Sequence, residues 1–188
     1  MANRFSRAHN ILSQTAADNN INNYPGADRN VNPLLTEETI WNNLRLVHEN
    51  CINPILDAFG AENIKITSAY RCMALNKIMG GTPNSQHING YAIDLVSIKH
   101  PSSLLWNFCF QNITSYNQLI WEFPERGDYT SPSRPFSWIH ISYIENNNPK
   151  TSTLSSKQES LHTLYQKETT CKIGNYTHNI VYADNNLL

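Results

Sequence analysis

The clearest periodic pattern in the chain is helical and begins after Thr36. Apolar side chains recur three or four positions apart from Ile40 to Ile55, which is the spacing of one face of an α-helix. Thr36 can cap the first turn, and Gly60 is expected to end the helix. Pro54 removes a backbone donor within the pattern, so the sequence predicts a bend at residues 50–53.

Shorter patterns of both kinds surround this helix. The segment Ile64 to Ser68 alternates as a half-buried strand does, and residues 101–113 have the apolar density of a helix packed on a sheet. An irregular arm is expected before residue 33, and a loop over residues 82–89. The expected strands are 64–68, 91–98, 118–123 and 137–144, and the other expected helices are 6–18, 72–79, 101–113 and 152–170.

Length and composition predict one compact domain followed by a polar segment. The chain has 188 residues, of which 40% are hydrophobic and 15% charged, within the ~100–200 residues of a typical domain. The composition becomes polar after Asn146-Asn147-Asn148-Pro149, and we interpret such asparagine runs as genome composition and loop chemistry. We expect a domain over residues 1–148, including the N-terminal arm, and a tail or accessory segment over 149–188.

The charge balance argues against nucleic acid as a partner. Fourteen basic and fifteen acidic residues leave a formal charge of -1, and no run of lysine or arginine could neutralise a phosphate backbone. The N-terminus lacks the continuous apolar segment of a secretion signal, and no stretch approaches the ~20 apolar residues of a membrane span. We therefore expect a soluble chain, made in the cytoplasm, with no membrane span.

The four cysteines are expected to be reduced. They lie far apart and form no Cys-x-x-Cys pair. Three of them fall within helical patterns, where a free cysteine usually behaves as a small buried apolar residue. A hydrolase that uses Cys72 or Cys109 as its nucleophile is a weak hypothesis, because the sequence around neither residue has an elbow or oxyanion signature.

His87, Asp94 and His140 are the residues that most suggest chemistry. Gly90 lies between the first two and allows the chain to turn there. Strict alternation over residues 137–142 places His140 on the strand face opposite the isoleucines on either side of it. Two imidazoles and one carboxylate are what a catalytic zinc needs when its fourth position stays free for water. The other five histidines are expected to be surface or hydrogen-bonded residues.

Several short motifs follow one another in a familiar order, and together they resemble a known family. They are Thr67-Ser68-Ala69-Tyr70-Arg71, Leu75-Asn76, Gly80-Gly81, Ser85-Gln86-His87-x-x-Gly90-x-Ala92-x-Asp94 and Trp138-x-His140. The combined pattern resembles the zinc D-alanyl-D-alanine carboxypeptidase and L-alanyl-D-glutamate peptidase family, particularly its phage-type members. The resemblance spans residues 6–145.

This resemblance implies a fold and a cofactor. The fold would be a small α+β domain of the DD-peptidase and hedgehog type, with a small antiparallel sheet, flanking helices and an open zinc site. The resemblance also implies that Zn²⁺ is held by His87, Asp94 and His140.

The implied activity is hydrolysis of peptide bonds in the stem peptides of bacterial peptidoglycan. The chain would act as a monomeric lysis enzyme or as a wall-penetrating virion component, and would reach the wall through a pore, in a particle or on host lysis. The alternative is a catalytically silent relative whose zinc stabilises the fold and whose cleft binds wall peptide or a protein partner.

Glu122 is the candidate general base, because it ends a strand pattern whose apolar composition would otherwise exclude a charge. A salt bridge at the rim of the domain is the alternative. Several family members place a glutamate or histidine shortly before the last zinc ligand, whereas this chain has Ser137 and Trp138. Three further carboxylates therefore stay open as bases: Glu125, Asp128 and Glu145.

Arg71, Ser85 and Trp138 are the candidate substrate-binding residues. By the resemblance, Arg71 and Ser85 hold the substrate carboxylate or polarise the scissile carbonyl, and a guanidinium fork suits a carboxylate. A structural ion pair for Arg71 and a turn cap for Ser85 are the alternatives. Trp138 would line a cleft with Tyr91 and Tyr143, unless these aromatic residues belong to the core.

Overall fold

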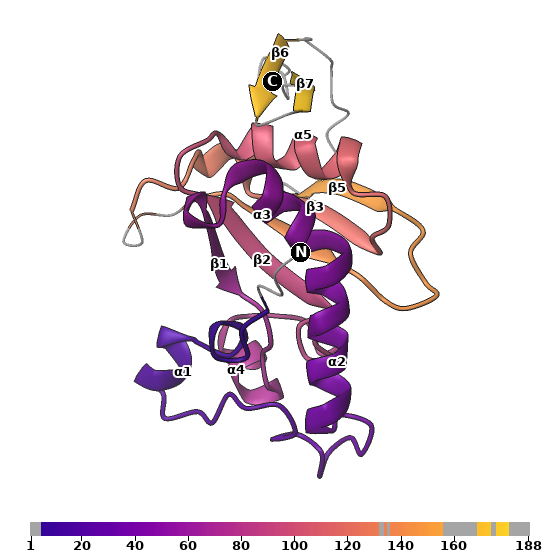
Figure 1. Cartoon of the computed structure of the whole chain (residues 1–188). Coiled ribbons are helices and arrows are strands. Elements are labelled where there is room, and N and C mark those ends of the chain that lie inside the picture. Colours follow the sequence, from indigo (N-terminus) through magenta and orange to yellow (C-terminus); the bar gives the residue numbers. More distant parts are fainter. Residues whose placement is uncertain (1–4, 132–133, 135, 156–168, 174–175, 181–188) are drawn as a thin grey trace.

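The centre of the fold is a five-stranded sheet. A computed structural model describes residues 5–131, 134, 136–155, 169–173 and 176–180 (Figure 1). The strand order is β1-β2-β4-β3-β5, in which the first four strands pair antiparallel and β5 pairs parallel with β3. The strands are β1 (Ile64–Ser68), β2 (Ala92–Ser97), β3 (Gln118–Glu122), β4 (Trp138–Ser142) and β5 (Thr151–Ser155), and a separate hairpin joins β6 (Thr169–Ile173) and β7 (Tyr176–Ile180).

The predicted long helix is present and bends where the sequence places the bend. It comprises α2 (Glu37–Val47), a π-helical segment (His48–Ile52) and α3 (Asn53–Phe59). Its start is capped by Thr36, whose Oγ1 accepts a hydrogen bond of 3.1 Å from the backbone N–H of Thr39, and it ends at Gly60 with φ +84°. The π-helical segment ends two residues before Pro54, as expected where proline interrupts the ladder of hydrogen bonds.

The shorter helices follow the sequence closely, with one exception. The expected helix over residues 6–18 is divided into a 3-10 helix and a one-turn helix, because Ser13 adopts an extended conformation and caps the second piece. The predicted helices over residues 72–79 and 101–113 are confirmed to within two residues at each end. The elements are η1 (Ala8–Asn10), α1 (Gln14–Asp18), η3 (Ala61–Asn63), α4 (Met73–Ile78), α5 (Ser102–Asn112) and η4 (Pro124–Arg126). Helices beside a mostly antiparallel sheet confirm the α+β class.

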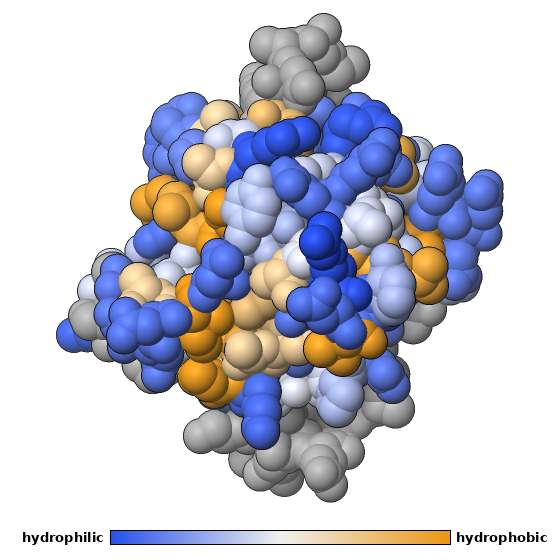
Figure 2. All heavy atoms as spheres, turned by 90° about the horizontal axis from the view of Figure 1, so that it is seen from below, coloured by the Kyte–Doolittle hydropathy of each residue, from blue (hydrophilic) through white to orange (hydrophobic). Residues whose placement is uncertain are grey.

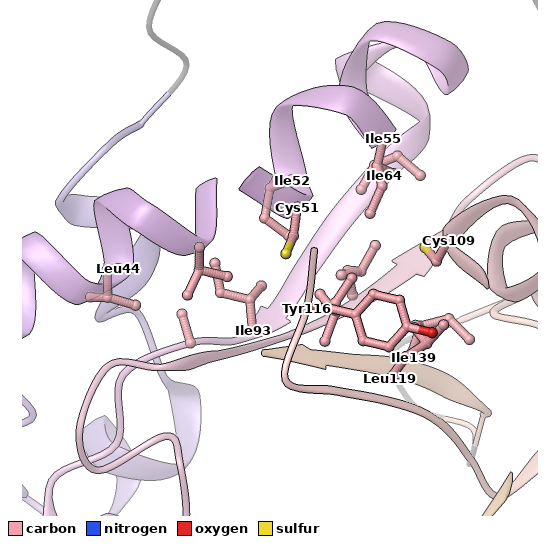
Figure 3. Packing of buried hydrophobic residues seen from close by; sticks show 14 of the residues in the cluster. Leu44, Cys51, Ile52, Ile55, Ile64, Ile93, Cys109, Tyr116, Leu119 and Ile139 are labelled. Carbon is pink, nitrogen blue, oxygen red and sulfur yellow. The ribbon is translucent and has the colours of Figure 1, made fainter. Parts of the chain in front are cut away.

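The hydrophobic core lies between one face of the sheet and the helices. Ile93 of β2, Leu119 of β3 and Ile139 of β4 are fully buried there, and Figure 3 shows them near side chains of α2, α3 and α5, among them Leu44 and Ile55. Because side chains alternate along a strand, the residues between these apolar positions point to the opposite face. Cys51, Cys72 and Cys109 are buried free thiols, as predicted.

The predicted helix over residues 152–170 is wrong wherever the structure describes it. Residues 151–155 form β5, and Thr169 begins β6, whereas residues 156–168 lie outside the described residues. The segment 151–155 contains two threonines, whose branched side chains favour a strand, and it finds a partner in β3. A polar pattern has no apolar stripe to bury as a helix. The division of the chain at residue 148 stays a prediction.

The surface carries scattered apolar side chains. Figure 2 views the molecule from the side of α1, α4 and the start of α2, and shows orange regions between hydrophilic ones. Exposed apolar residues from these parts of the chain include Leu12, Val31, Leu34 and Met79. Among the described residues, no helix has both the length and the apolar character needed to cross a membrane.

Candidate metal centre

The sheet register aligns three polar residues on the face opposite the core. Asp94 of β2 lies directly across from His140 of β4, and Ser68 of β1 lies across from Asp94 after an irregularity in the register between Ile66 and Ser68. Residues paired across antiparallel strands share a face. The side chains therefore come together although 72 positions separate Ser68 from His140 in the sequence.

His87 reaches the same place from the loop before β2. Gly90 makes the turn with φ +70°, and a Cβ atom there would lie 2.8 Å from the carbonyl oxygen of Ile40 in α2. Asn43 Nδ2 also donates a hydrogen bond of 2.8 Å to the carbonyl of Asn89. The loop is thus held against α2, and the expectation that Gly90 supplies the turn is confirmed.

The ligand atoms of the three residues converge. Asp94 Oδ1 lies 2.9 Å from His140 Nδ1 and 3.2 Å from His87 Nε2, and one ligand atom from each residue lies within 4.8 Å of the others. All three side chains are buried. Among the described residues, this is the only group of three or more His, Cys, Asp or Glu side chains that could hold a metal ion.

The protonation states suit a metal. His87 Nδ1 lies 2.6 Å from the carbonyl oxygen of Ala69, so Nδ1–H donates and Nε2 keeps its lone pair. Burial lowers the pKa of His87, which favours the neutral imidazole. Although burial alone would raise the pKa of Asp94, His87 and His140 hold that pKa well below its usual range. Neutral imidazoles and an ionised carboxylate are the forms that bind Zn²⁺, so the donor set fits this ion.

Arg71 lies against the same carboxylate. Its Nη2 is 2.5 Å from Asp94 Oδ2, and its Nε donates a hydrogen bond of 2.7 Å to Ser68 Oγ. The two oxygens of Asp94 are therefore divided between the histidines and the guanidinium. This contact favours the alternative of an ion pair, and substrate binding by Arg71 stays a prediction.

Glu122 lies on the same sheet face as His140, two residues further along β3 than the residue that pairs with His140. Ile120 is the residue opposite His140, and Glu122 is opposite Trp138. Of the three further carboxylates, Asp128 is engaged elsewhere: its Oδ1 accepts hydrogen bonds of 2.6 and 2.8 Å from the backbone N–H and the hydroxyl of Ser102 at the start of α5. Glu125 and Glu145 are exposed. The role of Glu122 as a base stays a prediction.

Trp138 belongs to an aromatic cluster beside the row of polar residues. Its ring centroid lies 5.2 Å from that of Phe123 and 6.5 Å from that of Phe136, and the guanidinium of Arg126 lies 5.8 Å from its ring centroid. The cluster is half-buried. It forms an apolar boundary on one side of the candidate site.

Ser85 lies in the loop that carries His87. Its backbone N–H donates to Thr82 and its carbonyl accepts from Ile88, at 3.1 Å in each case. These backbone contacts place Ser85 in a turn, and both the side-chain cap and substrate binding by Ser85 stay predictions.

Gln86 and Asn117 are two residues near the site for which the sequence predicts no role. Gln86 Oε1 lies 3.3 Å from His140 Nε2, and Gln86 Nε2 donates to Asn117 Oδ1 at 2.8 Å. The position of Gln86 beside His87 is the only local signal, because its partners are 31 and 54 residues away.

Two histidines and an aspartate whose ligand atoms converge beside a small sheet define a candidate metallohydrolase. The chain belongs to the Peptidase M15 family. The sequence model of this family matches residues 16–122, which is more than half of the sequence. Peptidases of this family are zinc-dependent. The matched residues include His87 and Asp94 and end before His140. A comparison with curated proteins gives no match.

Proposed function

We propose that this chain is a zinc-dependent peptidase that hydrolyses peptide bonds in the stem peptides of bacterial peptidoglycan. The convergence of His87, Asp94 and His140 within 4.8 Å, in a member of the Peptidase M15 family, is the observation that carries the proposal. We further propose that the domain is of the DD-peptidase and hedgehog type and that the chain is a phage-type lytic enzyme, which reaches the wall on host lysis or within a virion.

The proposed site assigns the zinc ion to His87, Asp94 and His140. Bound zinc would supply a Lewis acid and lower the pKa of its water to about 7. Arg71 neutralises the other oxygen of Asp94 and holds that side chain in place through Ser68. Burial of all three ligand side chains limits competition from bulk water.

Glu122 is the proposed general base. It lies on the face of the sheet that bears His140, where a carboxylate can take a proton from the attacking water and return it to the leaving amine. Such a role is worth about 10² to 10⁴ in rate. Of the other candidate carboxylates, Asp128 is bound to Ser102, and Glu125 and Glu145 are exposed.

Substrate recognition is assigned to three residues. Trp138 and its neighbours offer an apolar wall for the methyl groups of alanine. Arg71 and Ser85 are proposed to hold a carboxylate or the scissile carbonyl, and stem peptides are rich in free carboxylates. For Arg71 this role requires the guanidinium to bind substrate while it contacts Asp94, which its several donors permit.

The test is mass spectrometry of purified muropeptides after incubation with the zinc-loaded protein. We expect a pair of products whose masses sum to that of the substrate plus one water, and no products with His140→Ala. Intact muropeptides after incubation with protein that holds one zinc ion per chain would refute the proposal and favour the silent relative.

A further inference from the structure

A line of side-chain amides leads away from His140. Gln86 Oε1 lies 3.3 Å from His140 Nε2, and Gln86 Nε2 lies 2.8 Å from Asn117 Oδ1. Asn117 Nδ2 in turn lies 2.6 Å from the carbonyl oxygen of Asn147. The metal centre is thus connected through two amides to the turn that follows β4.

The carbonyl at the end of this line fixes the direction of each hydrogen bond before it. A backbone carbonyl can only accept, so Asn117 must present Nδ2 to Asn147, because the flipped amide would bring two oxygens together. Asn117 Oδ1 then faces Gln86 and accepts from its Nε2. Gln86 Oε1 is left facing His140, so His140 Nε2 must carry the proton.

The tautomer of His140 follows from this direction. With the proton on Nε2, the lone pair is on Nδ1, the atom that lies 2.9 Å from Asp94 Oδ1. A histidine binds a metal through its unprotonated nitrogen, and the hydrogen bond of the other nitrogen decides which one that is. The tautomer of His87 is fixed directly by the carbonyl of Ala69, whereas that of His140 is fixed through the side chains of Gln86 and Asn117.

The far end of the line is firmly held. The backbone N–H of Asn117 donates to the carbonyl of Ser142 at 2.7 Å. Asn147 donates its backbone N–H to the carbonyl of Ile144 at 2.9 Å, and the Asn148 side chain bonds the N–H and C=O of Ile144 at 3.0 and 2.7 Å. The asparagine run at 146–148 therefore closes a turn that orients the Asn147 carbonyl.

We propose that Gln86 is a positioning residue for the zinc ligand His140 and that Asn117, anchored on the Asn147 carbonyl, sets the orientation of the Gln86 amide. This inference rests on the zinc site of the proposed function. By this inference Gln86, the loop residue before His87, orients the imidazole of His140, 54 positions away in the chain.

The experiment measures the zinc dissociation constant by competition with a chromophoric chelator. Gln86→Leu removes the acceptor, and we expect it to weaken zinc binding about 10- to 100-fold. Gln86→Glu combined with Asn117→Leu keeps an acceptor for His140 Nε2–H and leaves no oxygen opposite the new carboxylate, so this double variant should bind zinc nearly as tightly as the wild type. Asn117→Leu removes only the orienting group and should have an intermediate effect. Asn84→Leu, an exposed position in the same loop, is the matched control and should have no effect.

A second readout reports the tautomer directly. Long-range proton–nitrogen NMR of the zinc-loaded protein should show the His140 proton on Nε2, in slow exchange with solvent because Gln86 Oε1 accepts it, and faster exchange of that proton in Gln86→Leu. Wild-type zinc affinity in Gln86→Leu would overturn the inference, as would an equal loss in the double variant Gln86→Glu with Asn117→Leu. Neither readout requires turnover, so a protein that shows the expected zinc affinities and cleaves no muropeptide would refute the proposed function and leave this inference standing.

Discussion

The two faces of the central sheet use the same strands for different purposes. On the face toward the helices, Leu119 and Ile139 are completely buried among apolar side chains. On the other face, Asp94 and His140 are also buried, but their partners are an arginine, a second histidine and amides. Alternation along each strand separates the two sets by a single residue.

The two faces contribute differently to the stability of the fold and to its chemistry. Burial of apolar area stabilises the fold in proportion to the area removed from water, so the helix-covered face should determine the free energy of unfolding. A buried carboxylate with two imidazoles contributes little of that kind and is costly unless partners compensate for the lost hydration. We therefore expect substitutions on the two faces to affect different measurements.

Removal of a ligand on the polar face should have the largest effect. His87→Ala and His140→Ala each take one of three donors from the site, so zinc should be lost on dialysis and peptide cleavage should fall to background. Metal analysis of the dialysed protein and the muropeptide assay measure both. About one zinc ion per chain in either variant would contradict the assigned ligands.

Removal of the proposed base should separate metal binding from turnover. Glu122→Gln keeps the size of the side chain and leaves His87, Asp94 and His140 intact, so zinc content should be unchanged. Turnover should fall at least about 100-fold, because proton transfer loses its carrier. Steady-state rates and metal analysis of the same sample test this, and wild-type turnover would remove Glu122 from the mechanism. Glu125→Gln, an exposed carboxylate nearby, is the control.

The helix-covered face should respond in the opposite way. Leu119→Ala opens a cavity at a completely buried position and should lower the free energy of unfolding by about 2 to 5 kcal/mol, with zinc content unchanged in the folded protein. Ile120→Ala is the matched variant. Ile120 follows Leu119 and is half-buried on the polar face, so its truncation should lower the free energy of unfolding by less. Denaturant unfolding measures both, and a larger loss for Ile120→Ala would reverse the assignment of the faces.

The apolar face was the easier of the two to predict from the sequence. Helical spacing from Ile40 to Ile55 and alternation around His140 are local signals, and the structure places the corresponding elements within two residues of the expected ones. The turn at Gly90 and the bend before Pro54 are local as well. Each of these features depends on the conformational preferences of a few consecutive residues.

The contacts of the polar face could not be predicted in the same way. Arg71 with Asp94 and Gln86 with His140 are pairs that meet only because the strands adopt one particular register, and register is a property of the assembled sheet. For the same reason the sequence did not reveal β5, a polar segment that becomes a strand by pairing with β3. The motif order identified the three candidate ligands, but not the groups that orient them.

A buried histidine on the helix-covered side supplies the last contrast with the metal centre. His48 is buried in the π-helical segment, and its Nε2 lies 3.1 Å from Asn10 Oδ1. Asn10 Nδ2 donates to the carbonyl of Ser6 at 2.7 Å, so its Oδ1 is an acceptor and His48 Nε2–H is the donor. Burial lowers the pKa of His48 from 6.5 to about 4, and in the part of the chain that the structure describes no carboxylate opposes this shift as Asp94 does for His87.

Acid should therefore destabilise the fold through His48. The unfolded chain binds a proton near pH 6.5 that the folded chain accepts only near pH 4, so the stabilisation is complete above pH 6.5 and is lost as the pH falls toward 4. The total loss should be about 3 kcal/mol. His48→Gln keeps a donor for Asn10 but does not titrate, so denaturant unfolding of both zinc-free proteins from pH 7 to pH 4 should give a shallower dependence in the variant. Because both proteins retain His87 and His140, equal pH dependences would show that His48 is not held neutral by its surroundings.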